Sequence, residues 1–147
     1  MEFNYEIELV EKFIKNLKIS NLGYHKCIQH ITEFDYRNGR PDIVFLDQFG
    51  EIVSIEAKLS NWRKAMDQAY RNTCFSDFSY ILLPENKINI ALRYQKCFTE
   101  RSVGICHLRN NKIFVSLSAQ KTQPLFDWLK NKAIVEIKSG GFYGLAC

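Results

Sequence analysis

Hydrophobic residues recur along this chain with two different spacings, and each spacing predicts a different kind of element. Near the N-terminus they return every three or four residues, which is typical of one face of an amphipathic helix. The residues of this stripe are Phe3, Ile7, Leu9, Val10, Phe13, Ile14 and Leu17. Further along, continuous apolar runs of strand length occupy residues 43–46, 52–57, 80–83, 103–108 and 113–117. Residues 24–36 are mixed and predict one more strand, whose phase the pattern leaves open.

A second helical stripe follows residue 61, where Ser60 or Asn61 can cap the helix. Its predicted buried face consists of Trp62, Ala65, Met66, Ala69, Tyr70 and Thr73. Residues 88–98 and 125–132 predict two more helices, the latter directly after Pro124. The order is then helix, three strands, helix, strand, helix, two strands and helix. This order predicts an α/β fold with a mixed central β-sheet flanked by helices.

The runs at 43–46 and 52–57 read as one β-hairpin with a short connection. A three-residue loop at 48–50 with Gly50 in the left-handed conformation would place Asp47 opposite Glu51. The register of the hairpin depends on that loop, because a shift by one residue moves every side chain to the other face.

The same register places Asp42 opposite Glu56, with Cβ atoms about 4.5–5.5 Å apart. Lys58 shares the face of Glu56, because side chains alternate along a strand. Two carboxylates and one ammonium group are therefore predicted to converge where the two strands end. An ExK tripeptide is also typical of a solvated strand face. Here, however, Glu56 and Lys58 interrupt an otherwise apolar strand, where charge is costly unless it is paired or metal-bound.

Composition adds limits to this picture. The 147 residues fit one domain, 1–147, with a tail from about residue 139 that three glycines predict to be loose. The five cysteines form no CxxC pair, and no run approaches the ~20 apolar residues of a membrane span. Reduced thiols and a cytoplasmic location without membrane attachment are expected. The net charge of +4 permits a nucleic-acid partner without requiring one.

The predicted trio suits metal-dependent hydrolysis of a phosphodiester. Mg²⁺ prefers oxygen ligands and often takes only one or two carboxylates, which Asp42 and Glu56 supply. The metal would polarise the phosphoryl oxygen and acidify a water molecule. Lys58 would orient or deprotonate that water, or offset the charge that builds up on the phosphorus centre.

Pro41-Asp42, then Glu56-Ala57-Lys58, then a helix carrying Gln68 resembles the PD-(D/E)xK nuclease superfamily, which includes restriction endonucleases and archaeal Holliday-junction resolvases. The stretch 56–69 is similar to the EAKLxxWRxAxxQA signature of small uncharacterised members. The resemblance covers about residues 5 to 115 and is specific at 41–84.

The resemblance implies a restriction-endonuclease-like core with Mg²⁺ or Mn²⁺ as cofactor. It implies Asp42, Glu56 and the carbonyl of Ala57 as metal ligands and Lys58 as the catalytic amine. Gln68 would reach the site from its helix. The alternative interpretation is that Gln68 is simply a polar residue at the boundary of the core. A first-helix glutamate joins the site in many members. Glu6 is the best choice here, although a solvated carboxylate at a helix start is equally compatible.

Basic residues flank the proposed site in sequence and are candidates for phosphate contacts, although a solvated charged face explains them equally well. They are Arg37, Arg40, Arg63, Lys64 and Arg71. The three histidines lack a partner at useful spacing and are interpreted as structural.

The leading hypothesis is a divalent-metal-dependent nuclease, with DNA as the expected substrate. One alternative is a catalytically silent nucleic-acid-binding or assembly module on the same fold. Another is a nuclease subunit that acts only beside a partner protein. A homodimer would equally present two sites to two strands.

Overall fold

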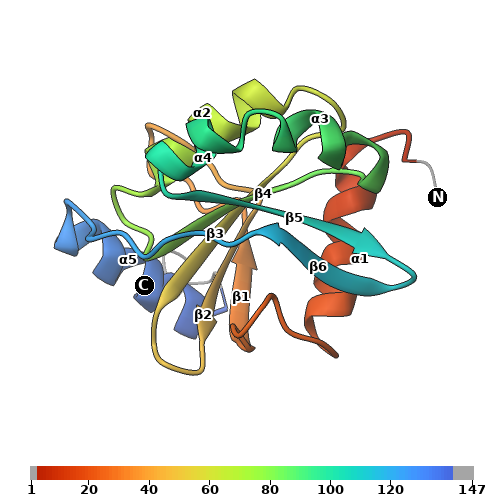
Figure 1. The fold of residues 1–147 in the computed structure, drawn as a ribbon. Helices are drawn as coiled ribbons and strands as arrows, with labels where there is room; N and C mark the ends of the chain where they lie inside the picture. Colours follow the sequence, from red (N-terminus) through yellow and green to blue (C-terminus); the bar gives the residue numbers. More distant parts are fainter. Residues whose placement is uncertain (1–2, 141–147) are drawn as a thin grey trace.

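The structure is a computed structural model in which residues 3–140 are described, and it is a mixed α/β fold (Figure 1). The strands are β1 (Cys27–Thr32), β2 (Ile43–Asp47), β3 (Ile52–Ala57), β4 (Phe78–Leu82), β5 (Val103–Arg109) and β6 (Lys112–Leu117). The helices are α1 (Glu6–Leu17), α2 (Trp62–Asn72), α3 (Ile88–Leu92), α4 (Gln95–Glu100) and α5 (Asp127–Lys138), with a 3₁₀ turn η1 (Glu85–Lys87). Ser139 and Gly140 follow α5, and the rest of the predicted loose tail lies outside the described residues.

The six strands form one sheet in sequence order, flanked by helices as the sequence predicts. β3, β4 and β5 are parallel to one another, whereas β1–β2, β2–β3 and β5–β6 are antiparallel pairs. The three parallel strands therefore deliver their carboxyl ends to one edge of the sheet.

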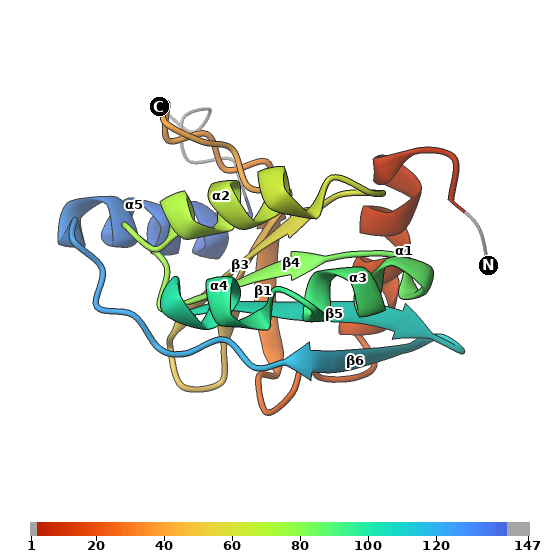
Figure 2. The same cartoon turned by 45° about the horizontal axis from the view of Figure 1, so that its top comes forward.

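Helices cover both faces of the sheet, and alternate residues of each strand point to opposite sides. Val53 and Ile55 of β3 pack in one core cluster with α1, while Ile52 packs in another with α5. A third cluster joins α2 and α3 to β4 and β5. Figure 2 shows α2, α3 and α4 on the same side of the sheet. β3 is consequently buried along its whole length.

The predicted hairpin register is confirmed. Ile43 pairs with Ile55 and Leu46 with Ile52, and the N–H of Asp47 donates to the carbonyl of Glu51 at 2.9 Å. Gly50 has a φ of +78°, as a three-residue loop with a left-handed last residue requires. Continued by one residue, this register sets Asp42 opposite Glu56.

The carboxylate of Asp47 is a main anchor of the loop, beside the side chain of Gln48, which bonds to the backbone of Tyr24 and Lys26. Oδ1 of Asp47 accepts hydrogen bonds from the N–H groups of Phe49 and Glu51, both at 2.9 Å. Its other oxygen lies 2.8 Å from Nδ1 of the buried His25, which precedes β1. Asp47 thus ties the hairpin loop to the edge strand.

Two positions of the predicted helical stripes are wrong. Ile7 of α1 and Tyr70 of α2 are more than half exposed, at 58% and 53%. On α2 the next buried residue after Ala69 is Asn72. Tyr70 lies about 100° around the helix axis from Ala69 and therefore points to solvent. Sequence pattern favoured the aromatic side chain, but the burial of Asn72 is stabilised by hydrogen bonds.

The single helix predicted at 88–98 is two short helices, α3 and α4. Tyr94 leaves helical geometry with φ −112° and ψ 24°, and its ring stacks on Trp62 at 4.7 Å between centroids. The last helix begins at Asp127 and continues to Lys138, beyond the predicted 125–132.

The described residues contain neither a membrane-spanning helix nor a disulfide bond. Among the described residues, no helix is both long and apolar enough to cross a membrane. The four described cysteines are not disulfide-bonded, and Cys147 lies outside the described residues.

The left-handed position in the hairpin loop generates a stability prediction. Replacing Gly50 by alanine should cost about 1 kcal/mol in the free energy of unfolding, because a Cβ is disfavoured at positive φ although no atom lies within 4 Å of it. Chemical denaturation measures this loss. Phe49→Ala, an exposed residue of the same loop, is the control and should change stability less. Equal stability of Gly50→Ala and the native chain would contradict the assigned loop geometry.

Candidate functional site

Acidic and basic side chains meet where β2 begins and β3 ends. Asp42 directly precedes β2, Glu56 lies near the end of β3, and Lys58 follows that strand. α1 starts beside them with Glu6, whose Oε1 lies 3.5 Å from Nζ of Lys58. The structure therefore brings four of the predicted site residues together, from three separate elements.

Asp42 is fixed by the backbone of the neighbouring strand. Its Oδ2 accepts a hydrogen bond from the N–H of Ala57 at 2.7 Å. Burial raises the pKa of this carboxyl above its usual value, and Glu6 raises it further, whereas the Ala57 hydrogen bond and Lys58 act in the opposite direction. The carboxyl thus experiences both charges of the Glu6–Lys58 pair.

Glu56 is the most deeply buried carboxyl of the group, with 5% of its surface exposed. Burial raises its pKa to about 7. The side-chain amide of Asn72 donates to Oε2 at 2.8 Å and lowers the pKa, Asp42 raises it, and Lys58 lowers it. The mutual influence of Asp42, Glu56 and Lys58 reflects their convergence at this strand end.

Asn72 and Tyr36 are site residues that the sequence reasoning missed. The hydroxyl of Tyr36 donates to Oδ1 of Asn72 at 2.8 Å. This bond fixes the orientation of the amide, so that its N–H₂ group faces Glu56. The available signal was a polar residue in the buried stripe of α2, one helical turn after Gln68. Gly39 lies close against the Tyr36 ring, and a Cβ there would come within 2.5 Å of the hydroxyl.

Lys58 and Glu6 form the more open side of the site. Their side chains are 20% and 42% exposed. A pocket of about 440 Å³ opens beside them between α1 and the sheet, and Glu6, Glu33 and Asp42 contribute to its lining. This pocket gives solvent a route to the carboxylate of Asp42.

The predicted role of Gln68 is not tested by the observed contacts. Its side chain is half-buried, and among the described residues Oε1 has no hydrogen-bond partner. The hydrogen bond to Glu56 comes from Asn72 instead.

The predicted phosphate contacts occupy different environments. Arg71 donates to the carbonyl of Asn38 at 2.9 Å, which anchors the loop before β2. Arg63 lies over the rings of Trp62 and Tyr94, with its guanidinium carbon 4.5 and 4.7 Å from their centroids. Arg40 and Lys64 are exposed, together with Arg37. All five remain predictions as nucleic-acid contacts.

The carboxylates have the chemistry of a magnesium site. Their hydrogen bonds occupy Oδ2 of Asp42 and Oε2 of Glu56, so Oδ1 and Oε1 remain for a cation. Within residues 3–140, no cluster of three or more His, Cys, Asp or Glu side chains is arranged to hold a metal. Magnesium sites often use only one or two carboxylates and complete their shell with water, so a pair of carboxylates is compatible with this ion.

Comparisons with known proteins identify a fold neighbour and no family. No protein-family model matches the chain, and no curated protein matches it. A similar solved structure is the SPO1766 protein of unknown function from Silicibacter pomeroyi, with a TM-score of 0.57 and 19% sequence identity. The match covers 79% of this chain and 75% of that one. At this identity the likeness concerns the fold alone.

The raised pKa of Glu56 predicts how stability depends on pH. The folded value is about 7 and the reference value is 4.5, so the folded state retains its proton over a higher pH range. The stabilising contribution is complete below pH 4.5 and is lost as pH rises through 7. Chelated protein should therefore lose up to about 3 kcal/mol of unfolding free energy over this window.

Glu56→Gln should remove most of that slope and be more stable than the native chain at pH 8, as measured by urea denaturation. Glu100→Gln, which alters an exposed carboxylate on α4, is the matched control and should keep the native slope. An unchanged slope in Glu56→Gln would show that the buried carboxyl does not titrate in this window.

Proposed function

We propose that this chain is a divalent-metal-dependent nuclease of the PD-(D/E)xK type that hydrolyses phosphodiester bonds of DNA. The observation that carries the proposal is the convergence of Asp42, Glu56 and Lys58 at one strand end, in the hairpin register that the motif requires. The likeness to SPO1766 contributes only the fold, since that protein has no known function.

In this proposal Asp42 and Glu56 would hold one Mg²⁺ or Mn²⁺ ion, and the carbonyl of Ala57 would be a further ligand. When bound, the ion would polarise the phosphoryl oxygen and acidify a bound water. The N–H of Ala57 and the amide of Asn72 orient the two carboxylates, which limits the rearrangement needed on binding.

Lys58 supplies the mobile positive charge. Its amine is partly exposed, and within residues 3–140 its ion-pair partner is the partly exposed carboxylate of Glu6, so it can turn from Glu6 toward an incoming phosphate or water. At the phosphate it offsets negative charge as the bond to the leaving oxygen breaks. Glu6 holds the amine near the two metal-ligating carboxylates before substrate arrives.

The proposal predicts cleavage of DNA that depends on Mg²⁺ or Mn²⁺ and on the trio. Asp42→Ala and Lys58→Ala should each lower the cleavage rate by about 10²-fold or more, because one loses a metal ligand and the other the amine. Plasmid, linear, branched and single-stranded DNA, separated on gels after incubation, provide the measurement.

Asp67→Ala and Lys26→Ala are matched controls at exposed positions and should keep full activity. Cleavage that survives chelation, or persists in both site variants, would refute the assignment. Tight DNA binding without cleavage would favour the silent module, and cleavage only after addition of a partner protein would favour the subunit.

The environment of Glu56 predicts how the affinity for the divalent metal depends on pH. The carboxylate must be ionised to bind the metal, so metal-free protein should gain affinity for Mn²⁺ as pH rises through about 7. The Asn72 hydrogen bond favours the ionised form, and Asn72→Ala should therefore shift the rise in affinity to higher pH. Titration calorimetry at several pH values measures both effects. A midpoint that stays in place in Asn72→Ala would contradict the assigned role of the amide.

A further inference from the structure

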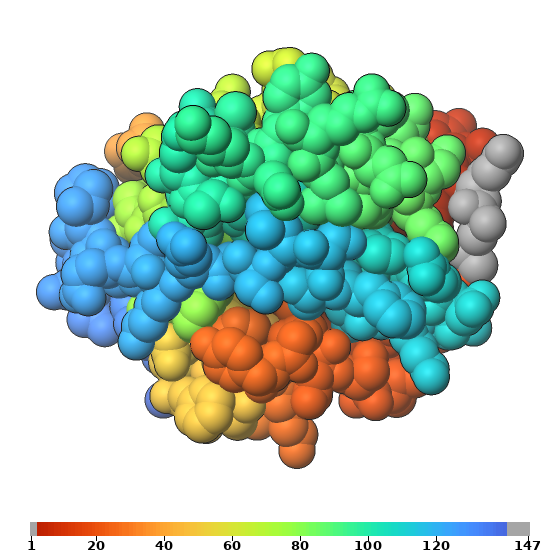
Figure 3. All heavy atoms as spheres, viewed as in Figure 1, coloured from red at the N-terminus to blue at the C-terminus, as the bar shows by residue number. Residues whose placement is uncertain are grey.

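A second cavity lies along the same edge of the sheet as the catalytic trio. It measures about 960 Å³ and is bounded by η1 and α3 on one side and by the β5–β6 hairpin on the other. In Figure 3 the green atoms of the α3 segment lie above the cyan atoms of the hairpin. Phe3, which precedes α1 by three residues, also lines it.

Strand register fixes how near this cavity is to the proposed reaction. The N–H of Lys58 donates to the carbonyl of Leu82, and the N–H of Leu83 donates to that of Cys106, both at 3.1 Å. Ala57, Leu82 and Cys106 are paired residues of the three parallel strands. One residue further along, Lys58, Leu83 and His107 therefore follow one another across the sheet edge.

Adjacent strands lie about 4.8 Å apart, so the backbones of Lys58 and His107 are separated by about 10 Å. The same row two residues earlier contains Glu56, Ile81 and Ile105, and Ile81 and Ile105 pack under α2 and α3. By alternation His107 shares that face with Glu56. The cavity is thus a neighbour of the proposed catalytic position at this edge of the sheet, and its lining extends from His107 to Phe3 and Lys12 on the α1 side.

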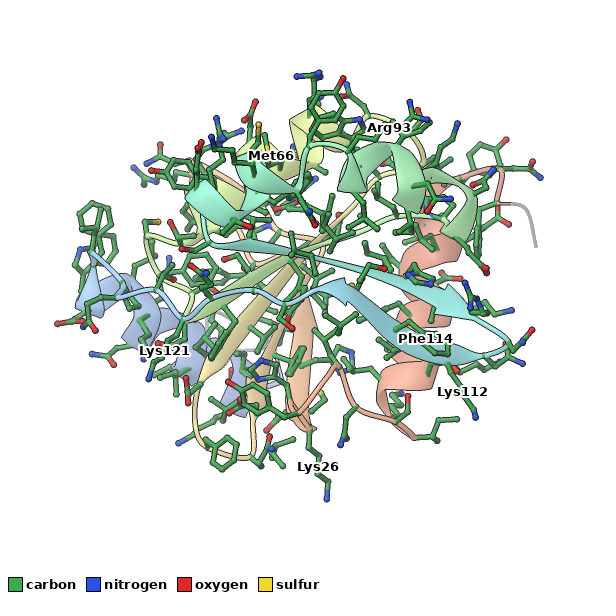
Figure 4. All side chains as sticks on the ribbon, in the orientation of Figure 1. Lys26, Met66, Arg93, Lys112, Phe114 and Lys121 are labelled. Carbon is green, nitrogen blue, oxygen red and sulfur yellow. The ribbon has the colours of Figure 1, made fainter. Side chains whose placement is uncertain are left out.

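His107 is buried at 6% exposure and contributes to the cavity lining. Its Nδ1 lies 3.2 Å from the hydroxyl of Ser116, whereas Nε2 is buried without a hydrogen-bond partner among the described residues. Burial lowers the pKa of the imidazole, which favours a neutral ring. The ring stacks on Phe114 with centroids 5.7 Å apart and planes at 19°. Figure 4 labels Phe114 on β6.

The rest of the lining combines amide groups with apolar surface. Asn86, Asn89, Asn110 and Asn111 supply donors and acceptors, and Ile88 and Leu92 supply apolar area. The charged residues of the lining are Lys12, Glu85 and Arg109, and Glu85 pairs with Arg109 at 2.8 Å. Glu85 neutralises one of the two cations and repels anions, and four amide side chains offer hydrogen bonds, so the lining suits a neutral planar group.

We propose that this cavity binds an unpaired nucleobase of the DNA strand that enters the catalytic site. Side-chain amides pair bidentately with base edges, and apolar side chains contact the base faces. A base can enter only when it is unstacked and unpaired, so the preferred substrate is single-stranded or frayed next to the cleaved bond. The inference rests on the proposed nuclease function and adds to it the form of the substrate.

The test separates base recognition from phosphate attraction. A fluorescently labelled single-stranded DNA and its fully abasic counterpart carry the same phosphates and differ only in the bases. Fluorescence anisotropy in chelator measures the affinity of the intact chain for each without cleavage. We expect the base-bearing strand to bind about tenfold tighter or more, as stacking and edge contacts of one base provide.

Asn89→Ala and His107→Phe should each reduce this affinity ratio toward one, because they remove an amide and the imidazole nitrogens from the lining. His107→Phe keeps an aromatic ring to pack on Phe114. Asn131→Ala, an exposed asparagine on α5, is the matched control and should keep the native ratio. Thermal melting checks folding, and the exposed Asn89 decides the matter if the His107 variant is unstable.

The inference would be overturned if the native chain bound the base-bearing and abasic strands equally well. It would also be overturned if the affinity ratio were unchanged in Asn89→Ala and in folded His107→Phe. The two proposals fail separately. If no metal-dependent cleavage is found but the affinity ratio falls in Asn89→Ala, the nuclease proposal fails and the base site stands. If the chain cleaves DNA but the affinity ratio is the same in Asn89→Ala and His107→Phe, the base-site proposal fails and the nuclease proposal stands.

Discussion

The hydrogen bonds of one carboxylate, Asp47, underlie the geometry of the whole site. By accepting from the N–H groups of Phe49 and Glu51 it stabilises a three-residue connection, and that connection sets the register of β2 against β3. A connection one residue longer or shorter would move Asp42 to the opposite face from Glu56. The candidate chemistry at one end of the hairpin therefore depends on backbone hydrogen bonds at the other end.

A second constraint is the burial of Glu56 in a strand that is otherwise apolar. A carboxyl in this position is costly when ionised, and the surrounding residues offset part of that cost through Asn72, which Tyr36 orients in turn. Gly39 allows the loop to approach Tyr36 closely. The loop before β2, the end of α2 and the end of β3 thus form one hydrogen-bonded unit around a single carboxyl group.

Local sequence signals were sufficient for the order of the strands and for the hairpin. Apolar runs located the strands, and Gly50 with its neighbours identified the loop that sets the register. Features that depend on tertiary contacts could not be predicted from the sequence. Asn72 takes the buried position that was predicted for Tyr70, and its amide has partners on two other segments. Tyr94 stacks on Trp62 at the point where the predicted helix is interrupted. The cavity beside His107 likewise requires the pairing of β3, β4 and β5, which no spacing in the sequence reveals.

If the proposed function holds, the raised pKa of Glu56 would link the stability of the chain to binding of the divalent cation. Near neutral pH the empty protein is in its less stable form, and a bound cation would favour the ionised carboxylate and the folded state together. Under the proposed function, a cell depleted of divalent cations would then hold molecules that unfold more often and are more readily degraded by proteases. Such a chain would be removed when it cannot act and would accumulate when it can.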